Sequence, residues 1–430
     1  MKCPLALREV VPATCLELPC NQGGGDGDRR LQGSVQLCRW FGRNFEPFDY
    51  QRDVIDGLLE RMGSGICTGM LTLPTGAGKT AVAATAALRD LAQLERGLVV
   101  WIAPQLELLD QARLAMERAW WTGFGPHSID LLMLRPGERF TRTHRHSVVF
   151  TTPASARKWI EEAEHSSAIT HLVFDEAHHL GAEVFSETWN FARQRAAKLR
   201  LALGLSATPI RHESLGADTL ERSLDGTLFY PKRLAPNPIE TLRARGVLSS
   251  LCVDTIPGIP RNAFAIDSAG KHHLAPLVSD ADYWMSCINA THEERGRVFV
   301  FCPTRAAGAL FSAHLCALGE SSEFIDGEDD FGTRIAVFER FRDGKTRIVV
   351  SVGLLLEGVD CPAAEAAIVT YPIASLVRLL QVAGRISRGP AVGGTAVARL
   401  RCADPRLVRF FASQASDVDF AAAWRDGVPL

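Results

Sequence analysis

The segment Leu71–Thr80 constrains this chain more than any other stretch of its 430 residues. It reads L-T-L-P-T-G-A-G-K-T, with apolar residues before it and the helix-forming run A-V-A-A-T-A-A-L after it. Glycines let the backbone curl so that successive N–H groups face one anion, and a helix that begins there adds the positive end of its dipole. A strand, a glycine loop and a helix in this order predict a phosphate-binding loop in an α/β domain.

Each residue type in this loop has an expected role. Lys79 is expected to pair with the β- and γ-phosphates of ATP, and the Thr80 hydroxyl to bind Mg²⁺. The strict pattern has glycine where this chain has Leu73. The residues expected to surround the nucleotide phosphates are Thr75, Gly76, Ala77, Gly78, Lys79 and Thr80.

A second motif, L-V-F-D-E-A-H at Leu172–His178, is an apolar strand that ends in two carboxylates. The end of a strand in an open parallel sheet is where ligands bind. We expect Asp175 to hold the Mg²⁺ and Glu176 to orient and deprotonate the attacking water. Taken alone, an acidic pair after a strand is as often a helix N-cap. Its place in the same predicted domain as Lys79 favours the catalytic interpretation.

Short β-branched runs alternate with helical patterns along the chain, which predicts parallel sheets with helices on both faces. The runs are 97–103, 147–151, 171–174 and 201–205, and then 297–301, 347–351 and 366–370. Between the two groups, residues 230–260 are dense in proline and glycine, which is typical of a domain boundary. The predicted division is an N-terminal arm with a glycine-rich linker (1–40), a first domain (41–235), an interdomain linker (236–260) and a second domain (261–430).

Composition excludes some classes of protein. The formal net charge is -2, so no overall basic field indicates a nucleic-acid binder, although local patches can serve. Eleven cysteines without a C-x-x-C pair do not predict a disulfide framework or a zinc ribbon. No stretch is long and apolar enough for a membrane span, and the N-terminus is a poor signal peptide. We therefore expect a cytoplasmic protein with reduced thiols.

The order of these motifs resembles that of superfamily 2 helicases and translocases of the D-E-A-H (DEAH box) type. The resemblance spans residues 45–390 and implies two tandem RecA-like domains with the ATP site in the cleft between them. The segments that carry it are Phe45–Ile55, Leu71–Thr80, Ala103–Gln111, Thr151–Pro153, Asp175–His178, Ser206–Thr208, Val298–Arg305, Val350–Asp360 and Gln381–Arg388.

The resemblance also implies roles for individual residues. Gln51 would bind the adenine base, and Arg385 and Arg388 would reach across the cleft to the γ-phosphate, with Arg388 as an arginine finger. An isolated arginine pair on a helix is usually solvated, and only the other motifs favour this role. The further nucleotide-binding residues would be Gly358 and Asp360. The residues that couple nucleotide state to strand binding would be His178, Ser206, Thr208 and Gln381. The contacts to the nucleic-acid backbone would be Gln105, Thr152, Thr304 and Arg305.

Within the superfamily, the spacing is most similar to the restriction-enzyme-subunit and XPB-like duplex-DNA translocases. The expected function is an ATP-dependent DNA helicase or translocase that contacts the backbone without sequence specificity. Two alternatives stay open: an RNA helicase, and a nucleotide-gated subunit of a repair or phage-defence complex with little motor activity alone. Thr152, Thr304 and Arg305 would alternatively cap helices, but their positions in the family pattern favour backbone contacts about twofold. The basic loop 139–146 is either part of the nucleic-acid track or a solvated charge run.

Overall fold

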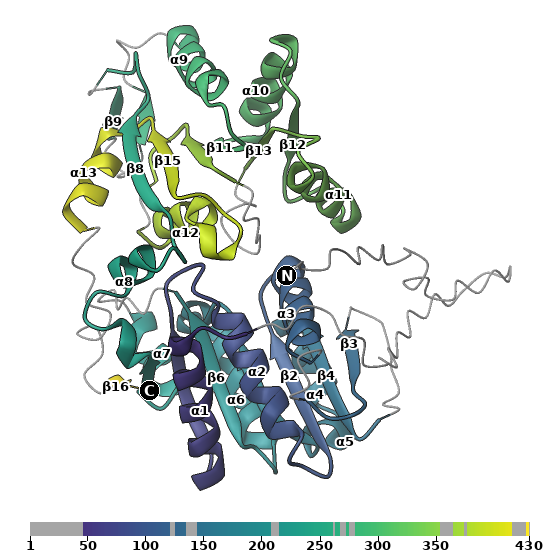
Figure 1. Ribbon diagram of the computed structural model, residues 1–430. Helices are drawn as coiled ribbons and strands as arrows, with labels where there is room; N and C mark the ends of the chain where they lie inside the picture. Colours follow the sequence, from purple (N-terminus) through teal and green to yellow (C-terminus); the bar gives the residue numbers. More distant parts are fainter. Residues whose placement is uncertain are drawn as a thin grey trace, which may run out of the picture.

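The computed structural model describes residues 46–120, 125–134, 144–207, 215–260, 263–266, 272–274, 280–352, 364–373, 376–414 and 427–429. These residues form two parallel sheets, each with helices on both faces, and the two layered units lie one above the other in Figure 1. The predicted fold class, two tandem α/β domains of the RecA-like kind, is confirmed.

The first sheet has eight strands in the order β16-β7-β1-β6-β5-β2-β4-β3, and every pairing in it is parallel. The seven predicted β-runs all coincide with strands of the two sheets, to within two residues at each end. The strands of the first sheet are β1 (Cys67–Thr72), β2 (Gly97–Ile102), β3 (Asp130–Leu134), β4 (His146–Thr151), β5 (Ile169–Phe174), β6 (Leu201–Ser206), β7 (Leu228–Tyr230) and β16 (Gly427–Pro429).

Alternate side chains of each strand enter opposite cores. In β2, Val99 and Trp101 pack with helices α1, α2 and α3, whereas Val100 and Ile102 pack with α4, α6 and α7. Burial on both faces explains why these strands are continuously apolar. The helices of this unit are α1 (Asp49–Ser64), α2 (Lys79–Leu91), α3 (Leu106–Ala119), α4 (Pro153–Ile160), α5 (Ala163–Ser166), α6 (Glu183–Arg195) and α7 (Leu215–Ser223), with short 3₁₀ helices η3 (Ala177–Gly181) and η4 (Lys232–Leu234).

The second sheet has six parallel strands in the order β12-β13-β11-β14-β15-β8. Helices α11 and α12 pack on one face, and α9 and α10 on the other. The strands are β8 (Ser250–Thr255), β11 (Val298–Phe301), β12 (Ser322–Ile325), β13 (Ile348–Ser351), β14 (Ala366–Val369) and β15 (Val397–Cys402). The helices are α9 (Asp280–Glu293), α10 (Arg305–Ala317), α11 (Phe331–Arg342), α12 (Leu376–Ile386), α13 (Pro405–Gln414) and η6 (Pro390–Val392), and β9 (Phe264–Ile266) and β10 (His272–Leu274) form a separate hairpin.

Two segments of the chain form strands in sheets to which the predicted domain boundaries do not assign them. The range 236–260, predicted as a linker, contains α8 (Pro238–Ala244) and the edge strand β8 of the second sheet. The range 261–430, predicted as the second domain, contains β16, which pairs with β7 at the edge of the first sheet. Three-residue strands and a breaker-rich segment carry little sequence periodicity, so neither pairing could be read from the pattern. The chain therefore passes from the first unit to the second between Leu248 and β8, and β16 belongs again to the first sheet.

The parallel strands fix where a site can form. Because all strands of one sheet run the same way, the loops at their carboxyl ends meet at a single edge, where α/β proteins bind ligands. The segments after β1, β2, β4, β5 and β6 are those that carry the motifs of the first domain. Among the described residues, no helix has the length and apolar character that crossing a membrane requires.

Candidate active site

The phosphate loop forms a tight turn between β1 and α2. Gly76 and Gly78 have φ values of 94° and 89°, in the left-handed region that favours glycine. Gly78 is the N-cap residue of α2, and the Ala77 N–H donates to the Pro74 carbonyl at 3.0 Å. The loop therefore has the backbone form that surrounds a phosphate at a helix N-terminus.

Leu73 departs from the strict loop pattern without disturbing the turn. Its side chain is 1% exposed and packs in the core between the sheet and α1–α3. The φ angle of Leu73 is not in the positive range, so this position does not need glycine. Leucine here adds to the core, and the two glycines that the turn requires are present.

Helix α1 is bonded to the phosphate loop by two of its side chains. The Tyr50 hydroxyl and the Gln51 side-chain amide both donate to the Ala77 carbonyl, each across 2.9 Å. A side chain at Gly78 would collide with the Gln51 amide, so the two segments are in close contact. Gln51 was predicted to bind the base, and it also holds the phosphate loop in place.

Asp175 and Glu176 follow β5 at the same edge. The Asp175 N–H donates to the Ile102 carbonyl at 2.8 Å, which continues the pairing of β5 with β2. Asp175 Oδ1 accepts from the Glu176 N–H at 3.0 Å. Glu176 has φ 51° and ψ 53°, a left-handed backbone that is strained for a residue with a side chain. Such strain is common where a fold fixes the aim of a functional side chain.

The charges of the site perturb one another strongly. Burial lowers the pKa of Lys79, although Glu176 and Asp175 oppose this shift. Burial, followed by the charge of Glu176, raises the pKa of Asp175. Burial alone would raise the pKa of Glu176 as well, but His178, Lys79 and Arg385 outweigh it and lower that pKa. His178 Nδ1 lies 3.3 Å from Glu176 Oε2. Two adjacent carboxylates with opposite pKa shifts are suited to different roles.

Helix α12 of the second unit lies directly on the phosphate loop. A side chain at Gly384 would collide with Thr75, and a side chain at Gly76 would collide with the Arg388 guanidinium. Arg385 is 6% exposed, and its charge contributes to the lowered pKa of Glu176. The motif predicted to supply an arginine finger therefore contacts the loop predicted to hold the phosphates, across the boundary between the two units.

Several side-chain polar atoms among the described residues are buried without a hydrogen-bond partner, and two of the side chains concerned are Gln381 of α12 and Thr72 of β1. Both the oxygen and the nitrogen of the Gln381 amide lack one, as does the hydroxyl of Thr72 at the end of β1. Buried polar groups are normally paired, and exceptions call for an explanation such as a ligand.

The other predicted site residues are located as follows. Thr80 is in the first turn of α2, and Ser206 is the fully buried last residue of β6. Thr208, Gly358 and Asp360 lie outside the described residues, as do the arm 1–40 and positions 139–143 of the basic loop.

The predicted nucleic-acid contacts all stand at helix starts after strands. Gln105, Thr152 and Thr304 are the N-cap residues of α3, α4 and α10. Of these, the Thr304 hydroxyl accepts from the Ala307 N–H at 3.2 Å, so it caps its helix. Arg305 forms ion pairs with Asp326 and Glu328, each at 2.5 Å, so a phosphate would have to compete with both carboxylates.

A second contact between the two units was absent from the sequence predictions. Arg334 of α11 forms an ion pair with Glu107 of α3 at 2.5 Å, and both side chains are largely buried. Figure 1 shows α11 above α3, on the side of the molecule away from α8. No local pattern marks this pair, because the two residues are far apart in sequence and each is ordinary for its helix.

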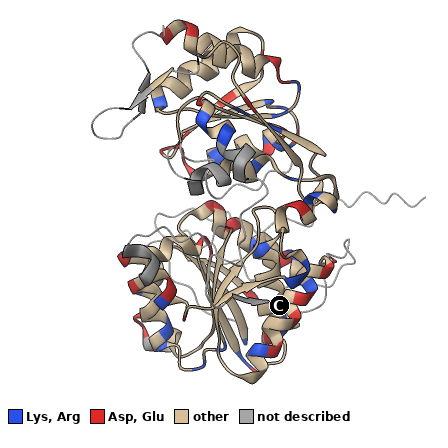
Figure 2. Cartoon of the chain, turned by 90° about the vertical axis from the view of Figure 1, so that its left-hand side faces the viewer, with Lys and Arg blue, Asp and Glu red and all other residues tan. Residues whose placement is uncertain are grey.

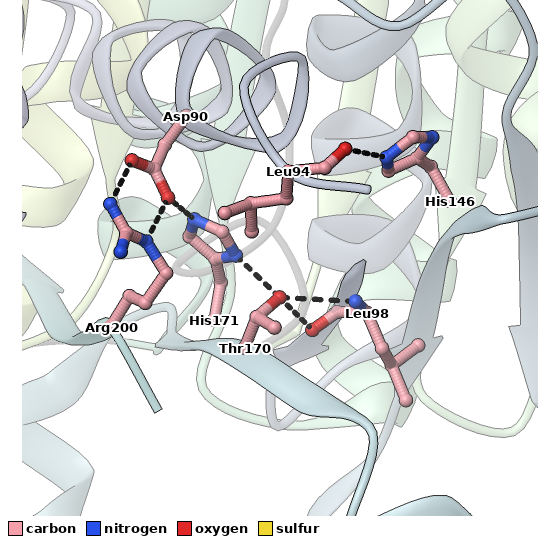
Figure 3. A network of polar contacts seen from close by, with 7 residues as sticks. All are labelled: Asp90, Leu94, Leu98, His146, Thr170, His171 and Arg200. Carbon is pink, nitrogen blue, oxygen red and sulfur yellow. Dashed lines mark hydrogen bonds and ion pairs between the residues drawn. The ribbon is translucent and has the colours of Figure 1, made fainter. Parts of the chain in front are cut away.

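A buried ionic network ties the opposite ends of the motif-bearing elements (Figure 3). Asp90, in the last turn of α2, accepts from Arg200 at 2.6 and 2.8 Å and from His171 Nε2 at 3.0 Å. His171 Nδ1 lies 2.9 Å from the Thr170 hydroxyl, which accepts from the Leu98 N–H at 3.0 Å. One carboxylate thus joins the elements whose other ends carry Lys79, Asp175 and Ser206.

Two family models match separate parts of this chain. The family model described as "Type III restriction enzyme, res subunit" matches residues 44–211, and "Helicase conserved C-terminal domain" matches residues 281–389. The first range contains the phosphate loop and both carboxylates, and the second contains Arg385 and Arg388. The resemblance inferred from the motifs is confirmed.

Individual relatives and structures are similar at low identity. The DNA 3'-5' translocase XPB2 of Sulfurisphaera tokodaii is 25% identical over 378 residues, 79% of this chain and 78% of that protein. The 51.5 kDa protein of a Lactococcus phage is 24% identical, over 74% of this chain but only 62% of the phage protein. S. cerevisiae Dbp5 bound to RNA and ADP BeF3 has a TM-score of 0.60 at 14% identity, covering 89% of this chain and 90% of Dbp5, which shows a shared fold.

Proposed function

Because this chain belongs to superfamily 2, the helicases and translocases built from two RecA-like domains, we propose that it is an ATP-dependent DNA helicase or translocase. The observation that carries the proposal is the contact between α12 and the phosphate loop. An arginine from one domain that reaches the phosphates on the other makes hydrolysis depend on the arrangement of the two domains. That dependence is what converts ATP hydrolysis into movement along a polymer.

The residues divide into roles by their geometry and charge. Lys79 pairs with the β- and γ-phosphates, and the loop Thr75–Gly78 surrounds them. Glu176, whose pKa is lowered, stays ionised and accepts the proton of the attacking water. Arg385 and Arg388 stabilise the charge that develops on the γ-phosphoryl group. Gln381 has an unsatisfied amide that fits a polar ligand between the domains.

Mg²⁺ is the proposed metal. The Thr80 hydroxyl and the Asp175 carboxylate would hold it, and hard oxygen donors of this kind are the ligands that Mg²⁺ prefers. Asp175 is 2% exposed with a raised pKa, so a cation beside it would stabilise its ionised form. The metal would neutralise charge on the phosphates during transfer.

The proposed nucleic-acid contacts are local rather than global. Figure 2 shows that basic and acidic positions are interspersed over both domains. Gln105, Thr152, Thr304 and Arg305 remain the proposed backbone contacts, since each lies at the carboxyl end of a strand, on the edge that carries the ATP motifs. Contacts to phosphate oxygens position a protein without reading sequence.

DNA is the proposed polymer because XPB2 is named a DNA translocase and is matched over most of its length. A protein partner, in a repair or defence complex, is proposed only as an addition to this activity. A cytoplasmic location is proposed because the six described cysteines, Cys67, Cys252, Cys287, Cys302, Cys316 and Cys402, are free thiols.

The deciding experiment measures phosphate release without polymer and with single-stranded DNA, duplex DNA or RNA. The expected result is strong stimulation by DNA, abolished by Lys79→Ala. Lys198→Ala is the matched control, because Lys198 is an exposed lysine at the amino-terminal end of β6, opposite the site. Stimulation by RNA alone would replace the polymer, and the absence of hydrolysis under every condition would overturn the proposal.

A further inference from the structure

Residues 247 and 248 belong to the first domain by their side chains, whereas the backbone of residues 246–249 pairs with the second domain. Val247 and Leu248 are buried in the core of the first domain. Their backbone pairs with the segment that follows α12. The Gly389 N–H donates to the Val247 carbonyl at 2.9 Å, and the Ser249 N–H donates to the Ser387 carbonyl at 3.2 Å. Leu248 and Arg388 form an antiparallel bridge. The segment thus connects the first domain directly to Arg388.

Ser249 reinforces this connection with its side chain. It is 1% exposed, and its hydroxyl lies 2.7 Å from the Arg388 carbonyl and 2.6 Å from the Thr395 carbonyl. A hydroxyl has one hydrogen, so it donates to one of these oxygens at a time. The Thr395 N–H also donates to the Arg388 carbonyl at 2.9 Å. The Arg388 carbonyl is therefore bonded both to Ser249 of the linker and to Thr395, just before β15.

The packing around this connection leaves little freedom. A side chain at Gly389 would collide with the Gly246 carbonyl, and a side chain at Gly394 would collide with the Arg388 carbonyl. On the opposite side, a Cβ at Gly76 would lie 3.1 Å from Leu248 Cδ2 and would collide with the Arg388 guanidinium. Leu248 and Arg388 therefore cover the same glycine of the phosphate loop, one from each strand of the bridge.

From this arrangement we propose that Ser249 is a positioning residue that holds Arg388 on the phosphate loop through the interdomain linker. The place of Arg388 then depends on a segment packed into the first domain, in addition to the body of the second domain. The inference rests on the proposed function, because it requires that Arg388 acts in ATP hydrolysis.

The test compares kcat and KM for ATP at a saturating concentration of the stimulating DNA. Ser249→Ala removes the donor and leaves a buried carbonyl with fewer partners, so kcat is expected to fall about tenfold with KM for ATP unchanged. Ser249→Cys keeps a weak donor and is expected to give an intermediate kcat, and it serves if the alanine variant does not fold. Ser312→Ala is the matched control, since Ser312 is a buried serine of α10 bonded to Ser322 instead.

A double-mutant cycle separates positioning from a merely structural effect. Arg388→Ala alone is expected to lower kcat at least a thousandfold, the loss typical of an arginine finger. If Ser249 acts through Arg388, Ser249→Ala causes no further loss of kcat in the Arg388→Ala background. Equal losses of kcat from Ser249→Ala in both backgrounds would overturn the positioning role, as would an unchanged kcat in Ser249→Ala alone.

The outcomes also distinguish this inference from the proposed function. A wild-type chain without DNA-stimulated hydrolysis refutes both. Wild-type hydrolysis that is lost in Lys79→Ala, but unaffected by Ser249→Ala, refutes only the positioning role. An unaffected kcat in Arg388→Ala refutes the positioning role as well, because nothing would then be positioned.

Discussion

The side-chain amide of Gln51 donates a hydrogen bond to the carbonyl oxygen of Ala77 across 2.9 Å. The amide oxygen of Gln51 also accepts from the N–H of Phe48 at 3.0 Å. An amide has two donor hydrogens and two acceptor lone pairs, so these bonds use one of each and leave one of each. The remaining pair matches the donor and acceptor edge of adenine. Gln51 can therefore hold the phosphate loop and bind the base together.

Gln51→Ala is expected to raise KM for ATP about tenfold and to reduce the preference for ATP over GTP. The reason is the loss of a paired contact to adenine, which is worth about 1–3 kcal/mol. Steady-state hydrolysis with both nucleotides measures the two effects. Tyr50→Phe is the matched control, because Tyr50 bonds the same Ala77 carbonyl at the same distance. Tyr50→Phe should lower the free energy of unfolding and leave the preference for ATP over GTP unchanged. A changed preference would show that the effect of Gln51→Ala arises from the phosphate loop and not from a contact to the base.

The close approach of Gly384 to Thr75 leads to a second prediction, which concerns kcat for ATP hydrolysis. Gly384→Ala would force α12 away from the phosphate loop, since the new Cβ would collide with the Thr75 side chain. We expect kcat to fall at least tenfold, because Arg385 moves with the helix. Gly63→Ala in α1 is the control: nothing lies within 4 Å of its Cβ, so it should only gain about 1 kcal/mol of helix propensity. Full activity in Gly384→Ala would contradict the observed docking.

Much of the first domain could be predicted because its signals are local. The phosphate loop lies between a strand and a helix whose side-chain patterns are both explicit, and each further motif of this domain follows an apolar strand. Parallel strands then bring Lys79, Asp175 and Ser206 to one edge by topology alone. The sequence could thus group these residues without knowledge of any long-range contact.

Other features depend on contacts between distant segments and left no local signal. Leu248 and Ser249 read as part of a proline- and glycine-rich linker, yet one is in the core of the first domain and the other is bonded to Arg388. The Glu107–Arg334 ion pair joins two ordinary amphipathic helices. Strand β16 consists of three residues, too few for a period. Such pairings follow from the three-dimensional packing of the chain.

At position 73, the strict phosphate-loop pattern and the structure lead to different expectations for a glycine substitution. Leu73→Gly restores the strict loop pattern, but we expect it to destabilise the protein by about 3–5 kcal/mol, as for a large core side chain that is removed. No gain in kcat should follow, because residue 73 does not need left-handed backbone. Chemical denaturation and steady-state hydrolysis measure the two effects. Leu310→Gly, at a 72% exposed position in α10, is the control and should cost about 1 kcal/mol.

The network around Asp90 also determines how stability depends on pH. Arg200 balances the charge of Asp90, and burial lowers the pKa of His171 below its ordinary value of 6.5. His171 is therefore neutral, with Nε2–H donating to Asp90. The single hydrogen of the Thr170 hydroxyl is shared between His171 Nδ1 at 2.9 Å and the Leu98 carbonyl at 3.1 Å. Burial would raise the pKa of Asp90, but the bonds from His171 and Arg200 outweigh it and lower the pKa below the ordinary 3.8. Asp90 therefore affects stability only under more acidic conditions.

A neutral buried histidine contributes stability that is complete above pH 6.5 and is lost as pH falls, because the unfolded chain then binds a proton that the native state excludes. The free energy of unfolding should decline by up to about 1.4 kcal/mol per pH unit on this account. His171→Asn should lower stability at pH 7.5 and weaken the decline between pH 6.5 and 5.5. Urea denaturation across this range measures it. The exposed His127→Asn is the control and should keep the wild-type slope. An equal slope in His171→Asn would show that His171 takes up as many protons in the native state as in the unfolded chain.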